Sequence, residues 1–215
     1  MWSSKKTQKL SLKRARDTTC TNEDTDEETT CKTDTTTHLN TINNHIYFNG
    51  DVTQKSMFNL ANELRNLRNK LKLRQLTYNM EQQPIYLHIT TNGGDVHAAF
   101  SMVDCIKSLD VPVYSVVDGL VASAGTIISV AATKKYICPN AYMLIHQLSS
   151  GVWGKMSWIE EQVSNLAKIM THITDLYLKH TSLKEKELKK LLLTDITWNA
   201  EECIKKGIAD EIYTA

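Results

Sequence analysis

Residues 85–133 decide the fold, and they run IYLHITTNGGDVHAAFSMVDCIKSLDVPVYSVVDGLVASAGTIISVAAT. The short β-rich run at 85–89 predicts a buried strand, and a helix is expected from about 96 to 109. A second strand is expected at 111–117, and small residues follow in a predicted helix at about 123–133. Strands that alternate with helices in this way are typical of an α/β domain built on a mostly parallel sheet.

The same alternation extends toward the N-terminus. Residues 46–48 predict a short strand, and the Asn-Gly-Asp sequence at 49–51 predicts a turn. From residue 53 the pattern becomes helical, because apolar residues recur every three or four positions and therefore share one face. That face consists of Met57, Leu60, Ala61, Leu64, Leu67 and Leu71. A polar stretch that ends at Pro84 separates this helix from the strand at 85–89.

A long helix is the main feature downstream, after two more strands expected near 136–138 and at 142–145. We expect this helix at about 156–179. Its apolar stripe consists of Ile159, Val163, Leu166, Ala167, Met170, Ile173 and Tyr177. Such a length is unusual inside one domain, so we expect the helix to extend beyond the core toward a partner subunit.

Capping-box patterns predict two shorter helices near the C-terminus. One pattern begins at Ser182 and has Glu185 three residues later; the other begins at Asn199 and has Glu202. Gly207 is expected to end the last helix.

Residues 1–43 differ in composition from the rest of the chain. They carry a basic run (Lys5, Lys6, Lys9, Lys13, Arg14, Arg16) and then an acidic run (Glu23, Asp24, Asp26, Glu27, Glu28). Little there repays the entropy of ordering, so we expect a disordered charged tail, followed by one domain at 44–215. The basic run is either a localisation or docking signal or simply a solvated, solubilising segment.

Charge and composition limit the classes of partner. The chain has 25 Lys and Arg against 24 Asp and Glu, a net charge of +1, so no overall field attracts nucleic acid or anionic lipid. Its five cysteines are widely spaced and form no C-x-x-C pair, which favours a reduced compartment and no metal site. The sequence has no apolar stretch of membrane-spanning length and no secretory signal pattern. We therefore expect a soluble cytoplasmic protein without nucleic-acid or membrane partners.

Ser123 is a candidate nucleophile because of its position in the chain. It follows the strand at 111–117 and stands at the start of the predicted small-residue helix. Small neighbours permit a tight strand-to-helix turn that exposes a hydroxyl, and the helix start supplies N–H groups to an oxyanion. The segment is not a strict G-x-S-x-G, because Val121 replaces the first glycine. On this pattern alone, Ser123 as a simple N-cap is the more common alternative.

Three further sites are candidates for catalysis. His146 ends the apolar strand at 142–145, which holds an imidazole at the edge of the sheet; a satisfied boundary histidine is the alternative. Asp195 lies in a short link between two helices, where it either orients His146 or caps a turn. Gly93 and Gly94 follow a strand and either supply an oxyanion donor or form an ordinary turn.

Taken together, these motifs resemble the proteolytic subunit of Clp protease over residues 44–215. The matching segments occur in the family's order: Asn92-Gly93-Gly94, then Ala122-Ser123-Ala124-Gly125, then Pro139-Asn140 with Met143-Leu144-Ile145-His146-Gln147, and finally Ala200-Glu201-Glu202-Cys203-Ile204 with Gly207 and Asp210.

The resemblance implies an ATP-dependent type of serine endopeptidase that acts on unfolded polypeptides. It implies Ser123 as nucleophile, His146 as general base and acid, and Asp195 as the residue that orients His146, with Gly94 and Ala124 forming the oxyanion hole. It further implies a crotonase-like spiral of βαβ units, in which the long helix is a protruding handle. It also implies stacked rings of seven identical subunits, a separate AAA+ unfoldase as partner, and no cofactor for the chemical step.

Several residues depart from the family pattern. Ala124 replaces a usual Met, Asn92 a usual Pro, and Leu148 a Pro that borders the substrate strand. Leu193 and Thr194 replace an Asp-Arg pair that links ring assembly to activity in the family. The hydrophilic tail also lacks a recognisable counterpart of the family's axial hairpin.

The same residues are also compatible with two other functions. The substitutions at Leu193 and Thr194 favour a non-catalytic subunit that builds or regulates a mixed ring. An acyl-CoA enzyme on the related crotonase fold would use Gly94 and Ala124 to polarise a thioester. That second alternative leaves the Ser, His and Asp set without a role.

Overall fold

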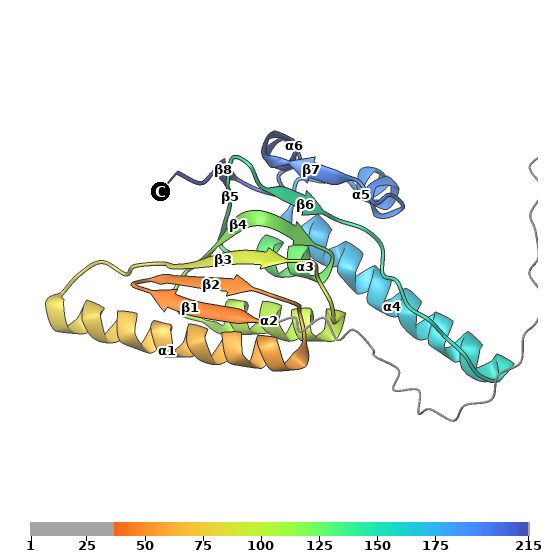
Figure 1. The fold of residues 1–215 in the computed structure, drawn as a ribbon, viewed down its shortest axis with the longest axis horizontal. Helices are drawn as coiled ribbons and strands as arrows, with labels where there is room; N and C mark the ends of the chain where they lie inside the picture. The colour runs from red at the N-terminus through yellow and green to blue at the C-terminus, as the bar shows by residue number, and fades with distance from the viewer. Residues whose placement is uncertain (1–36, 215) are drawn as a thin grey trace, which may run out of the picture. The chain divides into compact units, whose positions relative to one another are not determined.

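Eight strands form one sheet in the computed structural model, which describes residues 37–214 (Figure 1). The strands are β1 (His38–Ile42), β2 (His45–Asn49), β3 (Ile85–Thr91), β4 (Val113–Ala122), β5 (Lys134–Ile137), β6 (Tyr142–Leu144), β7 (Thr197–Asn199) and β8 (Glu211–Ile212). The helices are α1 (Gln54–Tyr78), α2 (Val96–Ser108), α3 (Ala124–Val130), α4 (Met156–His180), α5 (Glu185–Leu192) and α6 (Ala200–Lys205).

The sheet is mostly parallel, as the alternation of strands and helices predicts. Its strand order is β1-β2-β3-β4-β5-β8, with β6 beside β4 and β7 beside β6. The pairs from β2 to β5, β4 with β6, and β5 with β8 are parallel; only β1 with β2 and β6 with β7 are antiparallel. The predicted α/β class is therefore confirmed.

Strand β4 pairs with two different strands along its length, and this pairing positions the candidate nucleophile. Its first half pairs with β5 from Tyr114 to Val117, and its second half pairs with β6 from Leu120 to Ala122. The next residue, Ser123, therefore lies at the carboxyl end of β4, beside the end of β6. Active sites of parallel α/β sheets commonly form at this edge.

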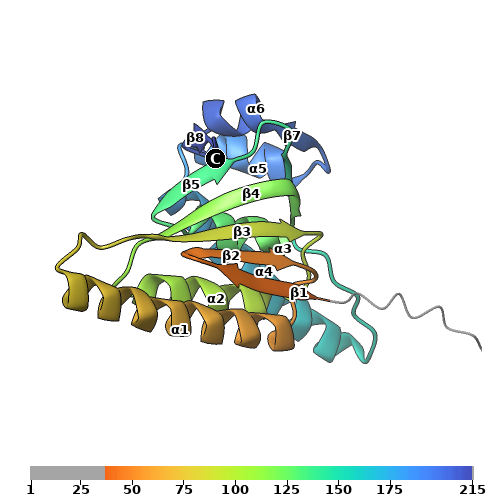
Figure 2. The ribbon, with the colours of Figure 1, turned by 60° about the vertical axis from the view of Figure 1, so that its left-hand side comes forward.

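Helices α1 and α2 lie against one face of the sheet (Figures 1 and 2). The predicted apolar face of α1 is buried from Met57 to Leu71, which confirms its 3.6-residue period. A capping box formed by Thr53 and Ser56 starts α1. Asp95 caps α2 by accepting hydrogen bonds from the N–H groups of His97 and Ala98.

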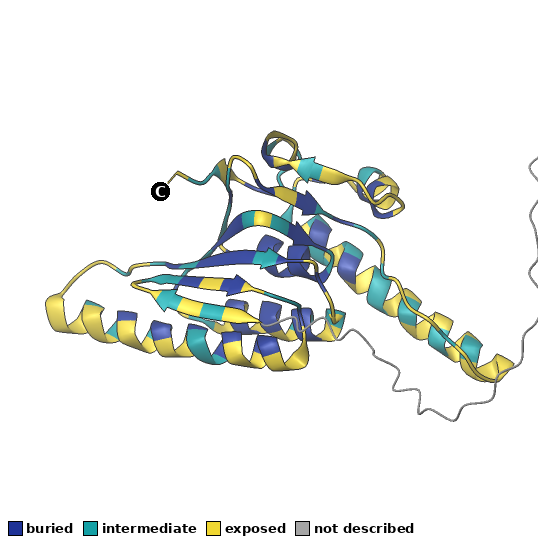
Figure 3. Ribbon diagram, in the orientation of Figure 1, coloured by how far each residue is buried: buried dark blue, intermediate teal, exposed yellow. Residues whose placement is uncertain are grey.

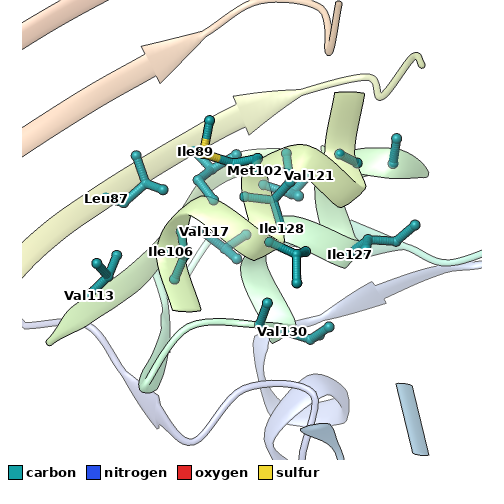
Figure 4. Packing of buried hydrophobic residues seen from close by; sticks show 14 of the residues in the cluster. Leu87, Ile89, Met102, Ile106, Val113, Val117, Val121, Ile127, Ile128 and Val130 are labelled. Carbon is teal, nitrogen blue, oxygen red and sulfur yellow. The ribbon is translucent and has the colours of Figure 1, made fainter. Parts of the chain in front are cut away.

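The core lies between the central strands and the helices that follow them. Figure 4 shows side chains of β3 and β4 packed with those of α2 and α3, including Ile89, Met102, Val121 and Ile128. Burying each such side chain contributes about 1.5–3 kcal/mol relative to leaving it exposed. This packing fixes the relation between the end of β4 and the start of α3.

Helix α4 extends away from the core, as its length predicts (Figures 1 and 3). The expected range of 156–179 agrees with the observed Met156–His180. Of the predicted apolar stripe, only Ile173 and Tyr177 are buried, while Val163 is 57% exposed. The core therefore holds only the C-terminal part of α4.

Three local predictions have different outcomes. Strand β1 lies at 38–42, inside the segment expected to be a disordered tail, so that expectation is wrong for these residues; residues 1–36 lie outside the described residues.

The capping box at Ser182 does not form, because α5 begins at Glu185 with Lys184 as its N-cap. Leu183 is buried and its N–H donates to Thr181, which keeps this segment out of the helix. The capping box of Asn199 and Glu202 is confirmed.

The other face of the sheet carries a hydrogen-bonded chain of polar side chains beneath aromatic rings. His88 Nδ1 donates to Asp118 Oδ2 at 2.7 Å, and the thiol of Cys138 donates to Asp118 Oδ1 at 2.7 Å. His88 Nε2 and His45 Nδ1 lie 3.0 Å apart. The rings of Tyr47 and Tyr86 stack on His88 and His45 respectively. A proton added to His45 would be held in a half-buried position beside His88.

Stability is therefore expected to fall as the pH drops below about 6.5. Burial, and secondarily the charge of His88, lowers the pKa of His45 below its usual value of 6.5. The unfolded chain then takes up a proton that the folded state resists, so this contribution is complete above pH 6.5 and lost below it. Urea unfolding at pH 7.5, 6.5 and 5.5 measures the effect. His45→Gln should flatten the profile; an equally steep profile would contradict this assignment.

Candidate active site

Ser123 has a backbone conformation that serine rarely adopts. It is the residue before α3, with φ 53° and ψ −125°, and its side chain makes no capping hydrogen bond. Such strain costs about 1–3 kcal/mol and persists where surrounding structure enforces it, commonly at functional sites. The N–H of Ser123 donates to the carbonyl of Leu144 at 2.8 Å, which ties the turn to β6. The structure thus does not use Ser123 as a side-chain N-cap.

Two glycines allow this turn to pack tightly against β3. A Cβ on Gly93 would lie 2.6 Å from the Cβ of Ser123, and Gly93 itself has φ +102°. A Cβ on Gly125 would lie 2.2 Å from Thr91 Cγ2. Real Cβ atoms do not come this close to other atoms, so both positions require glycine. Close packing by Gly93 therefore sets the position of Ser123.

The backbone around Gly94 is fixed by Val52. The N–H of Val52 donates to the carbonyl of Gly93 at 2.8 Å, and the N–H of Asp95 donates to the carbonyl of Val52 at 2.7 Å. A Cβ on Gly94 would lie 2.3 Å from that carbonyl oxygen. Within residues 37–214, neither Gly94 nor Ala124 uses its N–H in a hydrogen bond outside regular helix and strand pairing. An oxyanion that forms beside Ser123 requires two fixed N–H donors, and these two N–H groups are candidates for that role.

His146 follows β6 and lines the same pocket as Ser123, Gly94 and Ala124. Its side chain is 23% exposed. The N–H of the next residue, Gln147, donates to the carbonyl of Leu192 at 2.8 Å and fixes the chain beyond the strand. No hydrogen bond joins the side chains of Ser123 and His146 in the described part of the chain. Catalytic hydrogen bonds are often long without substrate and shorten when it binds.

Asp195 lies beside His146 and is not among the residues that line the pocket. Its Oδ1 is 3.7 Å from His146 Nδ1, which is longer than a hydrogen bond, and its side chain is 83% exposed. The residue before it, Thr194, is held by its N–H and hydroxyl to the carbonyl of Leu191. The structure therefore brings all five predicted site residues to one region. The carboxylate of Asp195 is not within hydrogen-bond distance of His146.

The pocket beside Ser123 is small and mostly apolar. Its volume is about 60 Å³, and Val96, Ile127, Ile173 and Tyr177 line it in addition to the candidate site residues. A larger hollow of about 680 Å³ lies between α4 and α5, but Ser123 and His146 do not line it. The sequence identified Ile173 and Tyr177 only as part of an apolar stripe. Their place beside Ser123 depends on tertiary packing that no local pattern reveals.

Residues 37–214 show neither a metal-binding cluster nor a membrane-spanning helix. No three His, Cys, Asp or Glu side chains there are grouped closely enough to hold a metal ion. None of the described helices combines the length and apolarity that crossing a bilayer requires.

Comparisons with known proteins agree with the resemblance seen in the sequence. The model of the Clp protease family matches residues 40–215. The ATP-dependent Clp protease proteolytic subunit 2 of Treponema denticola is 38% identical over 132 residues, which cover 60% of this chain and 66% of that protein. The proteolytic subunit 1 of Chlamydia muridarum is 31% identical over 171 residues, covering 78% of this chain and 84% of that protein.

The match to the first relatives is partial. The proteolytic subunit of Deinococcus radiodurans is 29% identical over 133 residues, covering 61% of this chain and 65% of that protein. The chain thus spans just under two thirds of the Treponema and Deinococcus proteins. A solved structure of a ClpP1 mutant from Listeria monocytogenes has a TM-score of 0.69 at 24% identity, covering 80% of this chain and 92% of that one. This likeness confirms the predicted spiral fold with its protruding helix.

Proposed function

Because this chain belongs to the Clp protease family, we propose that it is a serine endopeptidase subunit that hydrolyses peptide bonds of unfolded polypeptides. The observation that carries the proposal is the state of Ser123. Its strained backbone presents an uncapped hydroxyl to a pocket that His146, Gly94 and Ala124 also line. A structural serine has no need of that strain.

The proposed mechanism proceeds through an acyl-enzyme. Ser123 Oγ attacks the peptide carbonyl while His146 accepts its proton, and the N–H groups of Gly94 and Ala124 hold the oxyanion. His146 then gives the proton to the leaving amine. A water molecule, deprotonated by His146, then attacks the acyl group, and His146 returns that proton to Ser123 Oγ as the acyl bond breaks and the carboxylic acid product leaves. Each oxyanion donor typically contributes about 3 kcal/mol of transition-state stabilisation.

Asp195 has a positioning role in this proposal. Its carboxylate would accept a hydrogen bond from His146 Nδ1–H, which leaves Nε2 free to act as the base. That bond requires the observed separation of 3.7 Å to shorten. The exposed position of Asp195 gives it room to move.

Assembly and partners are part of the same proposal. The protruding α4 suits stacked heptameric rings, in which it would contact a second copy. Its exposed N-terminal half includes the large apolar residues Met156, Trp158 and Val163. These 215 residues contain no G-x-x-x-x-G-K-[ST] loop, so ATP would be hydrolysed by a separate AAA+ unfoldase.

A non-catalytic subunit of a mixed ring is the second candidate function. The 3.7 Å gap between His146 and Asp195 and the lack of a Ser123–His146 hydrogen bond favour it. Such a subunit would keep the fold and the ring contacts without peptide hydrolysis.

A hydrolysis assay on the purified protein, with its assembly state measured in parallel, tests the proposal. Substrates are a short fluorogenic peptide and a dye-labelled, permanently unfolded protein. The expected result is release of product from both by the ring-sized fraction. Ring formation only after a partner subunit is added, without hydrolysis that depends on Ser123, would favour the non-catalytic subunit.

Gly93→Ala is expected to reduce hydrolysis by about 100-fold. The new Cβ would overlap the Cβ of Ser123 at 2.6 Å and displace the nucleophile, and displacements of about 1 Å can cost this much. The rate of peptide hydrolysis measures the effect, and circular dichroism checks that the fold remains. Gly151→Ala is the matched control, because a Cβ there meets no atom within 4 Å. Full activity of Gly93→Ala would show that Ser123 is not held against Gly93.

A further inference from the structure

The peptide between Ser123 and Ala124 is held by hydrogen bonds from Thr126. The N–H of Thr126 donates to the carbonyl of Ser123 at 3.0 Å, and Thr126 Oγ1 donates to the same carbonyl at 2.6 Å. The hydroxyl of Tyr177, near the C-terminal end of α4, contacts Thr126 Oγ1 in turn. Thr126 is fully buried and Tyr177 is 2% exposed. Bulk water therefore does not compete for these bonds.

The direction of these hydrogen bonds follows from the number of available protons. Thr126 Oγ1 has one proton, which it gives to the carbonyl of Ser123. The hydroxyl of Tyr177 must therefore donate to Thr126 Oγ1. Burial raises the pKa of Tyr177, so its hydroxyl keeps this proton. Hydrogen bonds in series polarise one another, so donation by Tyr177 strengthens the bond from Thr126 to Ser123.

The carbonyl of Ser123 and the N–H of Ala124 belong to one peptide unit. This unit is planar and trans, so its C=O and N–H point in opposite directions. Bonds that fix the carbonyl of Ser123 therefore also fix the direction of the N–H of Ala124. Ala124 is the first residue of α3, where an N–H has no partner within the helix, and it lines the pocket beside Ser123. This N–H is one of the two candidate oxyanion donors.

The unusual backbone of Ser123 makes this peptide depend on support from its surroundings. The residues before α2 and α6, Asp95 and Asn199, have the extended backbone of ordinary N-caps, with ψ 118° and 176°. Ser123 has ψ −125°, so the peptide that follows it has a different orientation. Relaxation of Ser123 to the extended conformation would turn the N–H of Ala124 away from its present direction. The hydrogen bonds from Thr126 oppose that rotation, because they hold the carbonyl of the same peptide.

We propose that the hydroxyls of Thr126 and Tyr177 orient the N–H of Ala124 as an oxyanion donor, through the peptide that Ala124 shares with Ser123. Thr126 and Tyr177 are positioning residues in this role, since their hydroxyls bond to each other and to this peptide and not to the substrate. The proposal rests on the proposed function, because the oxyanion forms only when Ser123 attacks a carbonyl. It gives the buried end of α4 a part in transition-state stabilisation.

Variants that lack one hydroxyl should lose transition-state stabilisation and keep substrate binding. Thr126→Val replaces the hydroxyl by a methyl group and is expected to lower kcat for a short peptide about 100-fold, as removal of an oxyanion donor does. Tyr177→Phe keeps the ring and removes only the more distant hydroxyl, so a loss of about tenfold is expected. Thr126→Ser restores the hydroxyl and should recover kcat to within about threefold. KM should change less than about twofold in all three variants, because the bound ground state has no oxyanion.

A peptide aldehyde reports on the oxyanion site directly. Ser123 Oγ adds to its carbonyl carbon, His146 takes the proton of the Ser123 hydroxyl, and the carbonyl oxygen becomes the anion that the N–H of Ala124 would hold. The matching peptide alcohol has no carbonyl at that carbon and forms no adduct. Across the variants the aldehyde should lose affinity by the same factor as kcat/KM, while the alcohol should bind all of them equally.

Ser129→Ala is the matched control. Ser129 is also a buried residue of α3, and its hydroxyl contacts the hydroxyl of Ser115 at 3.3 Å. Its removal disturbs the packing of the same helix without a change at the peptide of Ser123. The kcat, the KM and the aldehyde affinity should therefore equal those of the unaltered protein. A loss of kcat as large as that of Thr126→Val would show a general effect of disturbing α3 and would overturn the positioning role.

The positioning role and the peptidase function fail in different ways. If Thr126→Val and Tyr177→Phe fold and keep the kcat and aldehyde affinity of the unaltered protein, the positioning role is overturned while hydrolysis that depends on Ser123 stands. Equal losses of aldehyde and alcohol affinity would overturn it too, because they would show a general loss of binding. If Thr126→Val does not fold, Tyr177→Phe decides the question. A folded, ring-sized assembly that neither hydrolyses peptide nor prefers the aldehyde to the alcohol would overturn the peptidase proposal, and the positioning role with it.

Discussion

Ser123→Ala should lower peptide hydrolysis by about 10⁴- to 10⁶-fold, the range found when the nucleophile of a serine triad is removed. The substitution takes away the only proposed attacking atom and leaves His146 without a proton to accept. Hydrolysis of a fluorogenic peptide by matched amounts of assembled protein measures the loss. Activity that depends on Ser123 is what separates a working peptidase from a structural subunit.

The same substitution should leave the fold unchanged. Within the described chain the Ser123 side chain caps nothing, so removing its oxygen breaks no hydrogen bond there. We expect the free energy of unfolding to change by less than about 0.5 kcal/mol. Ser157→Ala, at an exposed position in the first turn of α4, is the matched control and should retain full activity. Wild-type hydrolysis by Ser123→Ala would assign the activity to another residue or to a contaminant.

Asp195→Asn should reduce hydrolysis by about 10⁴-fold. An amide at this position can donate to His146 Nδ1 and would then hold the imidazole in the tautomer that has no free base on the Ser123 side. The loss should appear in kcat more than in KM, because Asp195 does not line the pocket. Steady-state kinetics with a short peptide separates the two parameters.

The exposed position of Asp195 makes this prediction a stringent one. At 83% exposure and 3.7 Å from His146, the carboxylate contributes little unless the contact closes during catalysis. Asp104→Asn, on the exposed side of α2, removes a comparable surface charge and should have no effect. Equal kinetics for Asp195→Asn and the unaltered protein would mean that His146 works without Asp195.

Regular periodicity made most of the fold predictable. Apolar spacing located α1 and α4, and the small-residue segment after β4 located α3, because burial on one face imposes these patterns directly. Strand β1 was missed, since its residues alternate between exposed and half-buried and include few strong strand formers. The signal was the Asn43-Asn44 turn, in which Asn43 has φ 57°.

The candidate site was predictable in its parts and not in its geometry. The sequence patterns predicted Ser123 at a helix start, His146 at a strand end and Asp195 in a link between two helices. It gave no sign of the positive φ of Ser123, which depends on packing against Gly93. The contact of the Tyr177 hydroxyl with Thr126 was equally hidden, because a stripe of apolar residues on α4 does not say which member meets Thr126. Contacts between distant segments set these features, and local patterns do not contain them.

Mass spectrometry of the native protein treated with a fluorophosphonate shows whether Ser123 is an activated nucleophile. We expect one adduct, located on Ser123, whose formation is suppressed in His146→Ala and slowed in Asp195→Ala. A well-folded, ring-sized assembly that carries no adduct on Ser123 would rule out this role of Ser123 and favour a non-catalytic subunit.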